Sequence, residues 1–329
     1  MNAAAAPEPR LTLRVDEAQG RRDARADRAF RWTLAAAALF VLVTLVGAAL
    51  SMAWGGREAF ATFGWEFFTG SDWDVGARKF GALVPIYGTV VSATIAMIIA
   101  VPVSFGIAVF LSEVAPPWMR TWVGSAIELL AGIPSIIYGM WGLFVLAPFL
   151  SESLFPWMDE RLGPIPAIGA LFRGPPLGIG MGTAGLVLAV MVIPFIASVM
   201  REVFLTVPTR LKESAYALGS TRWEVVWDIV LPYTRSAVIG GIFLGLGRAL
   251  GETMAVTFVI GNAYSMSPSL LEPGTSIAST IANEFGEALD PLHKSALLAL
   301  AFVLFMLTFV VLALAKFMLM KLKQREGTT

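Results

Sequence analysis

The sequence of 329 residues contains no cysteine and a single histidine. Without cysteine the chain can form no disulfide, no thiolate metal site and no thiol nucleophile. The one histidine, His293, gives little support for a histidine metal site or a Ser-His-Asp arrangement, and we expect it near a membrane boundary. The glycine-rich loop that ends in Gly-Lys-Ser or Gly-Lys-Thr and binds nucleotide phosphates is also absent from the sequence. We therefore expect no catalytic residue, no metal, no cofactor and no ATP hydrolysis by this chain itself.

Charged residues are scarce as well, at 15%, while hydrophobic residues make up 57% of the chain. This composition lies outside the range of soluble domains and indicates an integral membrane protein. Six apolar stretches are long enough to cross a bilayer, since about 20 helical residues span its hydrocarbon core. They are residues 32–53, 83–111, 121–150, 178–200, 236–262 and 292–320. We predict an all-α membrane protein with six transmembrane helices.

The segments around these stretches suggest how the chain is divided and oriented. Residues 1–31 form an Arg-rich tail without a sustained apolar face, which we expect to be disordered and cytoplasmic. Residues 32–82 hold the first transmembrane helix and a periplasmic segment, residues 83–320 hold the other five helices, and residues 321–329 form a basic cytoplasmic tail. Placing both termini in the cytoplasm puts most of the 24 Lys and Arg residues on the inner side, as the positive-inside rule requires. The Pro-rich segment 151–177 then lies outside the membrane and has too many prolines for a long helix.

The polar segment 201–235 separates the fourth and fifth apolar stretches and predicts two short helices. Leu211, Ala215 and Leu218 recur at helical spacing, so they share one face of the first helix. Gly219 can end this helix because glycine readily adopts the left-handed conformation. A cytoplasmic position for the segment follows from the predicted orientation.

The second short helix is predicted to begin at Thr221, which forms a capping box with Glu224. Its apolar stripe consists of Trp223, Val226, Trp227 and Val230. Leu231-Pro232 is predicted to end the helix. Two amphipathic helices of this kind suit either a groove on a soluble partner or the lipid surface, and their periodicity favours neither.

The fifth apolar stretch carries two charges, Arg248 and Glu252, four residues apart and so on one face of a continuous helix. Each charge costs about 2.5 to 3.5 kcal/mol on insertion scales, so both should face protein or water. One interpretation is a buried ion pair that fixes the orientation of the helix. The other is an anion site, in which Arg248 offers its guanidinium group and Glu252 holds that group and limits the affinity. Arginine alone does not select among phosphate, sulfate and molybdate.

Glycines in the same stretch predict close helix packing. Gly241 and Gly245, and then Gly247 and Gly251, are four residues apart. Such spacing places small residues along one side of a helix and lets a neighbouring helix approach.

The third apolar stretch contains both a proline and a charge. Pro134 interrupts the backbone hydrogen bonds inside the membrane and leaves polar groups that must face a partner or a cavity. Ser135 beside it either lines a solute path or is only part of the interruption of the helix. Glu128 is predicted to be a boundary charge that reaches water or pairs with a loop arginine.

The spacing within segment 201–235 resembles the EAA loop of ABC importer permeases. Glu213-Ser214-Ala215, Gly219, Ile229 and Leu231-Pro232 fit its pattern, with Ser214 as the one departure. In that family the loop enters a cleft on a cytoplasmic ATPase subunit and transmits its opening and closing to the membrane spans. The resemblance implies this coupling role for Glu213, Ala215, Gly219, Ile229, Leu231 and Pro232.

Two further stretches are similar to the PstC family of phosphate ABC transporter permeases. They are residues 132–142, which include Pro134, Ser135 and Tyr138, and residues 246–255, which include Arg248 and Glu252. The resemblance implies a type I ABC importer permease in the bacterial inner membrane that moves phosphate inward by alternating access. It also implies a second, PstA-like permease, two PstB-like ATPase subunits and a PstS-like extracytoplasmic phosphate-binding protein as partners. Arg248 and Glu252 match intramembrane residues that are important for transport in the family.

Three alternatives to a phosphate importer remain open on the sequence. The same residues would suit a sulfate or molybdate permease. An ion-coupled secondary carrier should show a second half that mirrors the first, and no clear internal repeat is present. A membrane sensor of phosphate status, with or without transport, is the third.

Overall fold

The computed structural model describes residues 17–166 and 168–326, with side chains from 26 to 321 apart from residue 167. The α-helices are α1 (Glu17–Gly55), α2 (Arg57–Phe63), α3 (Glu66–Thr69), α4 (Leu83–Val109), α5 (Pro117–Ala131), α6 (Ser135–Trp141), α7 (Ala147–Phe149), α8 (Phe155–Leu162), α9 (Met181–Leu205), α10 (Thr209–Ala217), α11 (Arg222–Val225), α12 (Leu231–Leu250), α13 (Met254–Val259), α14 (Ile277–Glu284) and α15 (Pro291–Glu326). The π-helical segments are η1 (Phe110–Val114), η2 (Gly142–Leu146), η3 (Leu150–Leu154) and η5 (Val226–Val230), and η4 (Gly169–Leu171) is a 3₁₀ turn. Strands β1 (Trp73–Asp74) and β2 (Lys79–Phe80) pair antiparallel, with Trp73 opposite Phe80.

Within the described residues, six helical stretches are long and apolar enough to cross a membrane. They are Ala26–Gly55, Leu83–Val114, Ser135–Leu162, Met181–Leu205, Arg222–Leu250 and Pro291–Lys321. The expectation of an all-α protein with six spans is therefore confirmed. The disorder expected for residues 1–31 concerns a segment of which only 17–31 is described, and this part is helical.

The chain forms two compact units, Met1–Ser51 and Met52–Thr329. In the first unit, the described residues belong to α1, whose side chains from 26 onward are largely exposed. The hydroxyl groups of Thr33 and Thr44 donate to carbonyl oxygens four residues earlier, at 2.9 and 2.8 Å. These bonds satisfy both hydroxyls within the helix, as a hydrocarbon environment requires.

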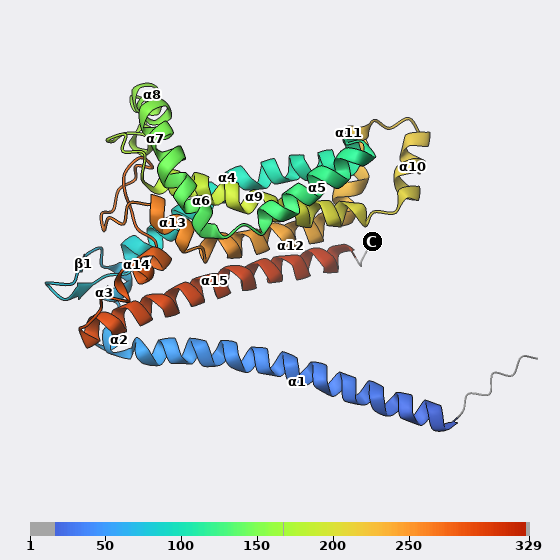
Figure 1. Cartoon of the computed structure of the whole chain (residues 1–329), viewed down its shortest axis with the longest axis horizontal. Coiled ribbons are helices and arrows are strands. Elements are labelled where there is room, and N and C mark those ends of the chain that lie inside the picture. Colours follow the sequence, from blue (N-terminus) through green and yellow to red (C-terminus); the bar gives the residue numbers. More distant parts are fainter. Residues whose placement is uncertain (1–16, 167, 327–329) are drawn as a thin grey trace, which may run out of the picture. The chain divides into compact units, whose positions relative to one another are not determined.

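The core of the second unit is built around α4 and α9, which lie side by side (Figure 1). Alanines at 93, 96 and 100 are buried on α4, and a side chain at Gly185 of α9 would collide with Ile95. The Ser104 hydroxyl donates to the Ile193 carbonyl at 3.0 Å and so links the two helices. Small residues thus allow the close contact on which the other spans are assembled.

Helix α12 packs on α9 through the glycines that the sequence singled out. A Cβ at Gly241 would lie 2.9 Å from Val199, and one at Gly245 would lie 2.6 Å from Ile196. Gly247 faces α15 instead, and a Cβ there would lie 3.4 Å from the side chain of Leu312. The predicted glycine groove is therefore correct for Gly241 and Gly245, whereas Gly247 serves a different neighbour.

The third span differs from its prediction. Helix α5 ends at Ala131, and a new helical run begins at Ser135 and continues through α6, α7 and α8 to Leu162. The break falls at Gly132–Pro134 because a proline disfavours the helical conformation of the residue before it. Pro148 and Pro156 lie in the first turns of α7 and α8, each after a π-helical segment, and so do not end the run. The irregular connection therefore starts after Leu162 and not at 151.

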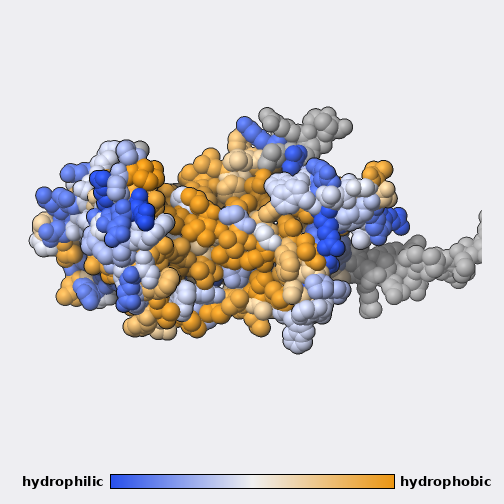
Figure 2. Space-filling view, turned by 90° about the horizontal axis from the view of Figure 1, so that it is seen from above, coloured by the Kyte–Doolittle hydropathy of each residue, from blue (hydrophilic) through white to orange (hydrophobic). Residues whose placement is uncertain are grey.

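The face of the molecule in Figure 2 carries a broad band of hydrophobic residues between two ends rich in hydrophilic ones. Such a band is typical of a protein whose middle contacts lipid. At one end lie β1, β2 and α14, and at the other lie α10 and α11 (Figure 1). We refer to these as the hairpin end and the α10 end.

Candidate functional site

Two helix breaks lie close together inside the second unit. One is Gly132–Pro134 between α5 and α6, and the other is Gly251–Thr253 between α12 and α13. Helices α6 and α13 pack against each other, and they come close at Gly139, where a Cβ would lie 3.0 Å from the Cα of Ala255. Broken helices within a membrane are tolerated where they are buried in protein or line a cavity.

Arg248 lies in the last turn of α12, directly before the second break. Its guanidinium carbon is 5.7 Å from the ring centre of Phe195, and its Nε is buried without a hydrogen-bond partner. Among the residues that the structure describes, the Arg248 side chain makes no ion pair. A half-buried guanidinium group thus lies against an aromatic ring, and its donors have no partner among the residues that the structure describes.

Glu252 does not share a helical face with Arg248, because α12 ends at Leu250 and Glu252 lies in the break. Its Oε1 accepts a hydrogen bond from the backbone N–H of Ala255 at 3.3 Å, so the carboxylate caps the start of α13. The ion pair with Arg248, which one interpretation of the sequence required, is not present in the described part of the chain, and Glu252 does not hold the guanidinium group. The prediction of a continuous fifth span through residue 262 is therefore wrong, and the helix that crosses the membrane is Arg222–Leu250.

Ser135 is the first residue of α6 and is half-buried. Its hydroxyl group has no hydrogen bond to any residue that the structure describes. Three residues later, the Tyr138 hydroxyl donates to the carbonyl of Leu130 at 2.9 Å and so bridges the break. The sequence singled out the stretch that contains Tyr138 but did not assign it this bridging contact.

Glu128 has the ionic partner that was predicted as one possibility. Its Oε1 lies 3.3 Å from Nη1 of Arg201, which also lies 3.0 Å from Glu202. Gly124 makes room for this arginine, since a Cβ there would lie 3.0 Å from its Cζ. The pair joins the last turn of α5 to α9.

The polar segment between α9 and α12 begins with helix α10, as predicted. Gly219 adopts a φ of 91°, and the N–H of Ser220 donates to the Ala215 carbonyl at 3.1 Å. This is the left-handed helix end that the sequence indicated. Leu211 and Leu218 are 44% and 88% exposed, while Ala215 is buried. Most of the apolar face of α10 is therefore uncovered in the single chain.

The second helix of the segment starts as predicted and then departs from the prediction. Thr221 and Glu224 form the capping box, with the Thr221 N–H 2.6 Å from Glu224 Oε2. Leu231-Pro232 does not end the helix, which passes through η5 directly into α12. Pro232 is tolerated because it follows the π-helical turn η5, in which the regular hydrogen-bond pattern of the helix is already interrupted.

The π-helical turn η5 also changes which residues of this helix are buried. Val225, Val226 and Val230 are buried, whereas Trp223 and Trp227 are 65% and 42% exposed. A wider turn shifts the register relative to the regular period of 3.6 residues, so the predicted stripe is split. The two tryptophans are left on the surface, where their ring centres lie 5.3 Å apart.

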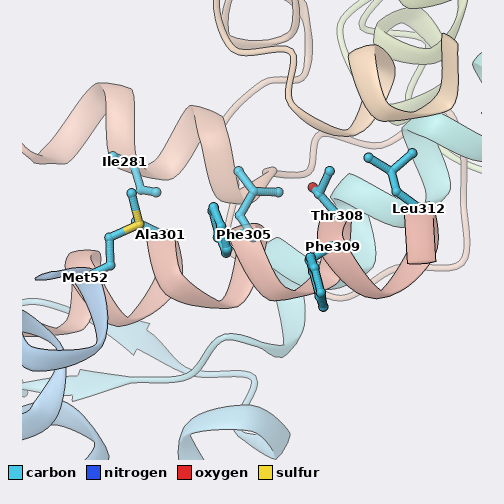
Figure 3. Close-up of a pocket in the computed structure, with 8 residues that line it drawn as sticks. Met52, Ile281, Ala301, Phe305, Thr308, Phe309 and Leu312 are labelled. Carbon is cyan, nitrogen blue, oxygen red and sulfur yellow. The ribbon is translucent and has the colours of Figure 1, made fainter. Parts of the chain in front are cut away.

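The cavities of the second unit differ in chemical character. An apolar pocket of about 440 Å³ lies along α15, lined by Met52, Ile281, Ala301, Leu304, Phe305, Thr308, Phe309 and Leu312 (Figure 3). This lining offers an anion no charged group. A polar cavity of about 570 Å³ lies at the α10 end, where Arg120, Lys212 and Arg222 are accompanied by Glu113 and Glu213.

At the hairpin end, four segments meet at the carboxylate of Glu284. Oε2 accepts a hydrogen bond from Trp73 Nε1 at 2.9 Å and lies 2.7 Å from His293 Nε2, and the Tyr264 hydroxyl donates to Oε1. His293 is buried against the ring of Phe80, with ring centres 5.2 Å apart. His293 is thus part of a structural network near the start of the last span.

Comparisons with known proteins identify a family and several relatives that this chain resembles. Residues 101–324 match the family described as binding-protein-dependent transport system inner membrane component. The chain is 67% identical over 306 residues to the phosphate transport system permease protein PstC of Xylella fastidiosa (strain 9a5c), covering 93% of this chain and 94% of the relative. It is 55% identical to PstC of Pasteurella multocida (strain Pm70), covering 91% and 93%. It is 38% identical to the probable PstC of Methanocaldococcus jannaschii, covering 77% and 81%.

Solved structures share the fold at low sequence identity. A bacterial ABC transporter involved in the import of the acidic polysaccharide alginate aligns with a TM-score of 0.57 at 16% identity, over 91% of this chain and 98% of that chain. An inward-facing form of the MetNI methionine ABC transporter aligns with a TM-score of 0.53 at 16% identity, over 72% and 94%. The arrangement of the helices is therefore that of ABC importer permeases.

Proposed function

The chain belongs to the binding-protein-dependent transport system inner membrane component family, as a multi-pass permease subunit of a phosphate ABC importer, and we propose that phosphate passes Arg248 on its way across the membrane. The proposal is supported by the free donors of Arg248 beside two helix breaks. An oxyanion accepts charge-assisted hydrogen bonds from a guanidinium group in a planar, forked geometry. This single observation carries the site assignment.

Glu252 and Ser135 complete the proposed solute path in different ways. Because Glu252 is engaged by the Ala255 N–H, it does not occupy the guanidinium group of Arg248. Its negative charge near the path still limits how tightly an anion is held, which suits a site that must release its cargo. Ser135, whose hydroxyl has no partner among the described residues, supplies a neutral hydrogen-bond donor at the other break.

Segment 201–235 is proposed to connect the permease to an ATPase subunit in the cytoplasm. Both chain termini then lie on the cytoplasmic side, together with α10 and α11. The exposed Leu211, Leu218 and Trp223 suit a groove on a soluble partner. Glu213, Ala215 and Gly219 belong to α10 and its end, while Ile229, Leu231 and Pro232 lie where the second helix passes into α12.

The proposed assembly contains four kinds of subunit. This chain pairs with a second, PstA-like permease on two PstB-like ATPase subunits, and a PstS-like binding protein delivers phosphate at the hairpin end. ATP is hydrolysed by the partner subunits and not by this chain. Closure of the ATPases shifts α10 and α11, and the solute path at Arg248 opens alternately to each side of the membrane.

Uptake by reconstituted complexes tests this function. Proteoliposomes that contain all the subunits should accumulate labelled phosphate only with ATP inside and the binding protein outside, and excess sulfate or molybdate should not compete. Leaving out the ATPase subunits is the control, and it should abolish uptake. Uptake driven by an ion gradient without the ATPases would contradict the proposal and favour a secondary carrier.

A further inference from the structure

A largely buried ion pair joins α10 to the end of the second span. Lys212 Nζ lies 2.6 Å from Glu113 Oε1, and the two side chains are only 13% and 6% exposed. Lys212 belongs to α10 and Glu113 to η1, so the contact links segments 99 residues apart in the sequence. Neither residue belongs to the EAA pattern or to the path at Arg248.

The energetics of buried charge indicate that this pair fixes the position of α10 relative to η1. Removing two charges from water costs about as much as their attraction returns, so an apolar pair of similar size would stabilise the fold equally well. Loss of one partner, by contrast, leaves the other charge buried and uncompensated. Each charge therefore fixes the place of the other.

The surroundings of the pair leave α10 with few other attachments. Of the nine residues of α10, all within the described part of the chain, only Ala215 is buried. On the side of Lys212 lies the polar cavity of about 570 Å³, which Glu113 and Lys212 help to line. Across this cavity, α10 is not held by apolar packing. The ion pair forms part of the cavity wall and joins α10 to η1 there.

Glu113 belongs to a segment that continues the second span. Segment η1 is a π-helical turn, closed by a hydrogen bond of 2.8 Å from the Ala115 N–H to the Phe110 carbonyl. Such turns are frequent at functional sites. It continues directly from α4, which packs along α9 and also against α12. Helix α12 carries Arg248 in its last turn.

Displacement of α10 can reach α12 by two routes. One is covalent, through α11 and η5. The other runs through Lys212, Glu113 and α4. We propose that the Glu113–Lys212 pair is a positioning link that makes the second and fifth spans move together when the ATPases displace α10. This role rests on the proposed function, and it assigns both residues to coupling and neither to solute contact.

The first test measures phosphate imported per ATP hydrolysed in proteoliposomes that hold the complete complex. Glu113→Gln and Lys212→Met should each lower this ratio about tenfold, a size typical of coupling between sites, while ATP hydrolysis continues. The charge-reversed double variant Glu113→Lys/Lys212→Glu should restore much of the ratio. Lys316→Met, which removes an exposed lysine of α15, is the matched control and should leave the ratio unchanged.

The second test measures the distance between η1 and α10 and does not depend on phosphate transport. Because the chain has no cysteine, spin labels can be placed at Val114→Cys and Arg210→Cys, both exposed, in a complex whose partners are free of cysteine. With the native pair, the distance between the labels should be the same before and after ATP is trapped. With Lys212→Met, it should shift or broaden when ATP is trapped.

The outcomes separate this link from the proposed function. An unchanged transport ratio in both single variants overturns the link, as does a label distance that Lys212→Met leaves unaffected. Failure of the single variants to assemble with the ATPases, without restoration by the charge-reversed pair, also overturns it, since the pair would then be structural. If the native complex imports no phosphate, the proposed function fails, and the label distances still decide whether the link exists.

Discussion

Glu284 is the residue at which the hairpin end of the second unit is held together. Its carboxylate contacts Trp73 of β1, Tyr264 of the loop between α13 and α14, and His293 of α15. Burial raises the pKa of Tyr264, and the hydrogen bond to Glu284 raises it further. The carboxylate of Glu284 thus joins α14 to three other segments of the chain.

Removing the Tyr264 hydroxyl should weaken this end. Tyr264→Phe should lower the free energy of unfolding by about 2 kcal/mol at pH 7, since hydrogen bonds to charged groups contribute about that much. Thermal unfolding of the purified protein in detergent measures the change. Tyr233→Phe, at a tyrosine that is 57% exposed, is the control and should have little effect.

The same contact predicts a dependence on pH. Because the pKa of Tyr264 is raised in the folded chain, the folded state keeps the phenol proton longer than the unfolded state does. The stabilisation is complete below the unfolded pKa of about 10 and is lost as the pH rises through the folded pKa. The difference in unfolding temperature between wild type and Tyr264→Phe should thus persist at neutral pH and shrink in strong alkali. A constant difference at every pH would contradict the assignment.

At the scale of helices, the contact between α6 and α13 positions the two breaks. Gly139 permits it, because a Cβ there would lie 2.9 Å from the Phe258 ring and 3.0 Å from the Cα of Ala255. Backbone atoms cannot move aside as a flexible side chain can. A side chain at Gly139 would therefore force the two helices apart.

An alanine at this position should force the helices apart. Gly139→Ala should destabilise the protein by about 1 to 3 kcal/mol, as overpacking of a tight contact does. Gly240→Ala is the matched control, because no atom lies within 4 Å of its Cβ position. Unfolding temperatures of the two variants in detergent decide the matter. Equal stability of Gly139→Ala and the wild type would show that the contact can relax without loss.

The sequence predicted the number of spans, the end of α10 and the capping box, since these depend on local composition and spacing. It did not predict the ends of the third and fifth spans, because apolar residues resume directly after both breaks. Hydropathy cannot distinguish a helix that crosses a membrane from one that stops inside protein. Arg248 and Glu252 were recognised as unusual, but their relation depended on whether the helix continued beyond Leu250.

At the scale of the whole chain, the exposed residues indicate a subunit of a larger assembly. Apolar side chains remain uncovered both along the spans and on α10 and α11, and the latter pair lies at a hydrophilic end of the molecule. Lipid accounts for the first group. The second group, which includes Leu218 at 88% exposure, requires a protein partner or the lipid surface. The family to which the chain belongs favours the protein partner.

The most direct test of the central claim compares transport with ATP hydrolysis in the Arg248→Ala complex. Phosphate uptake should fall at least tenfold, because a charge-assisted hydrogen bond contributes about 1.5 to 3 kcal/mol. ATP hydrolysis stimulated by the binding protein should persist, and Arg57→Ala, at an exposed surface arginine, should leave both activities intact. Undiminished uptake by Arg248→Ala would remove this residue from the solute path. Loss of both activities together would instead give Arg248 a structural role.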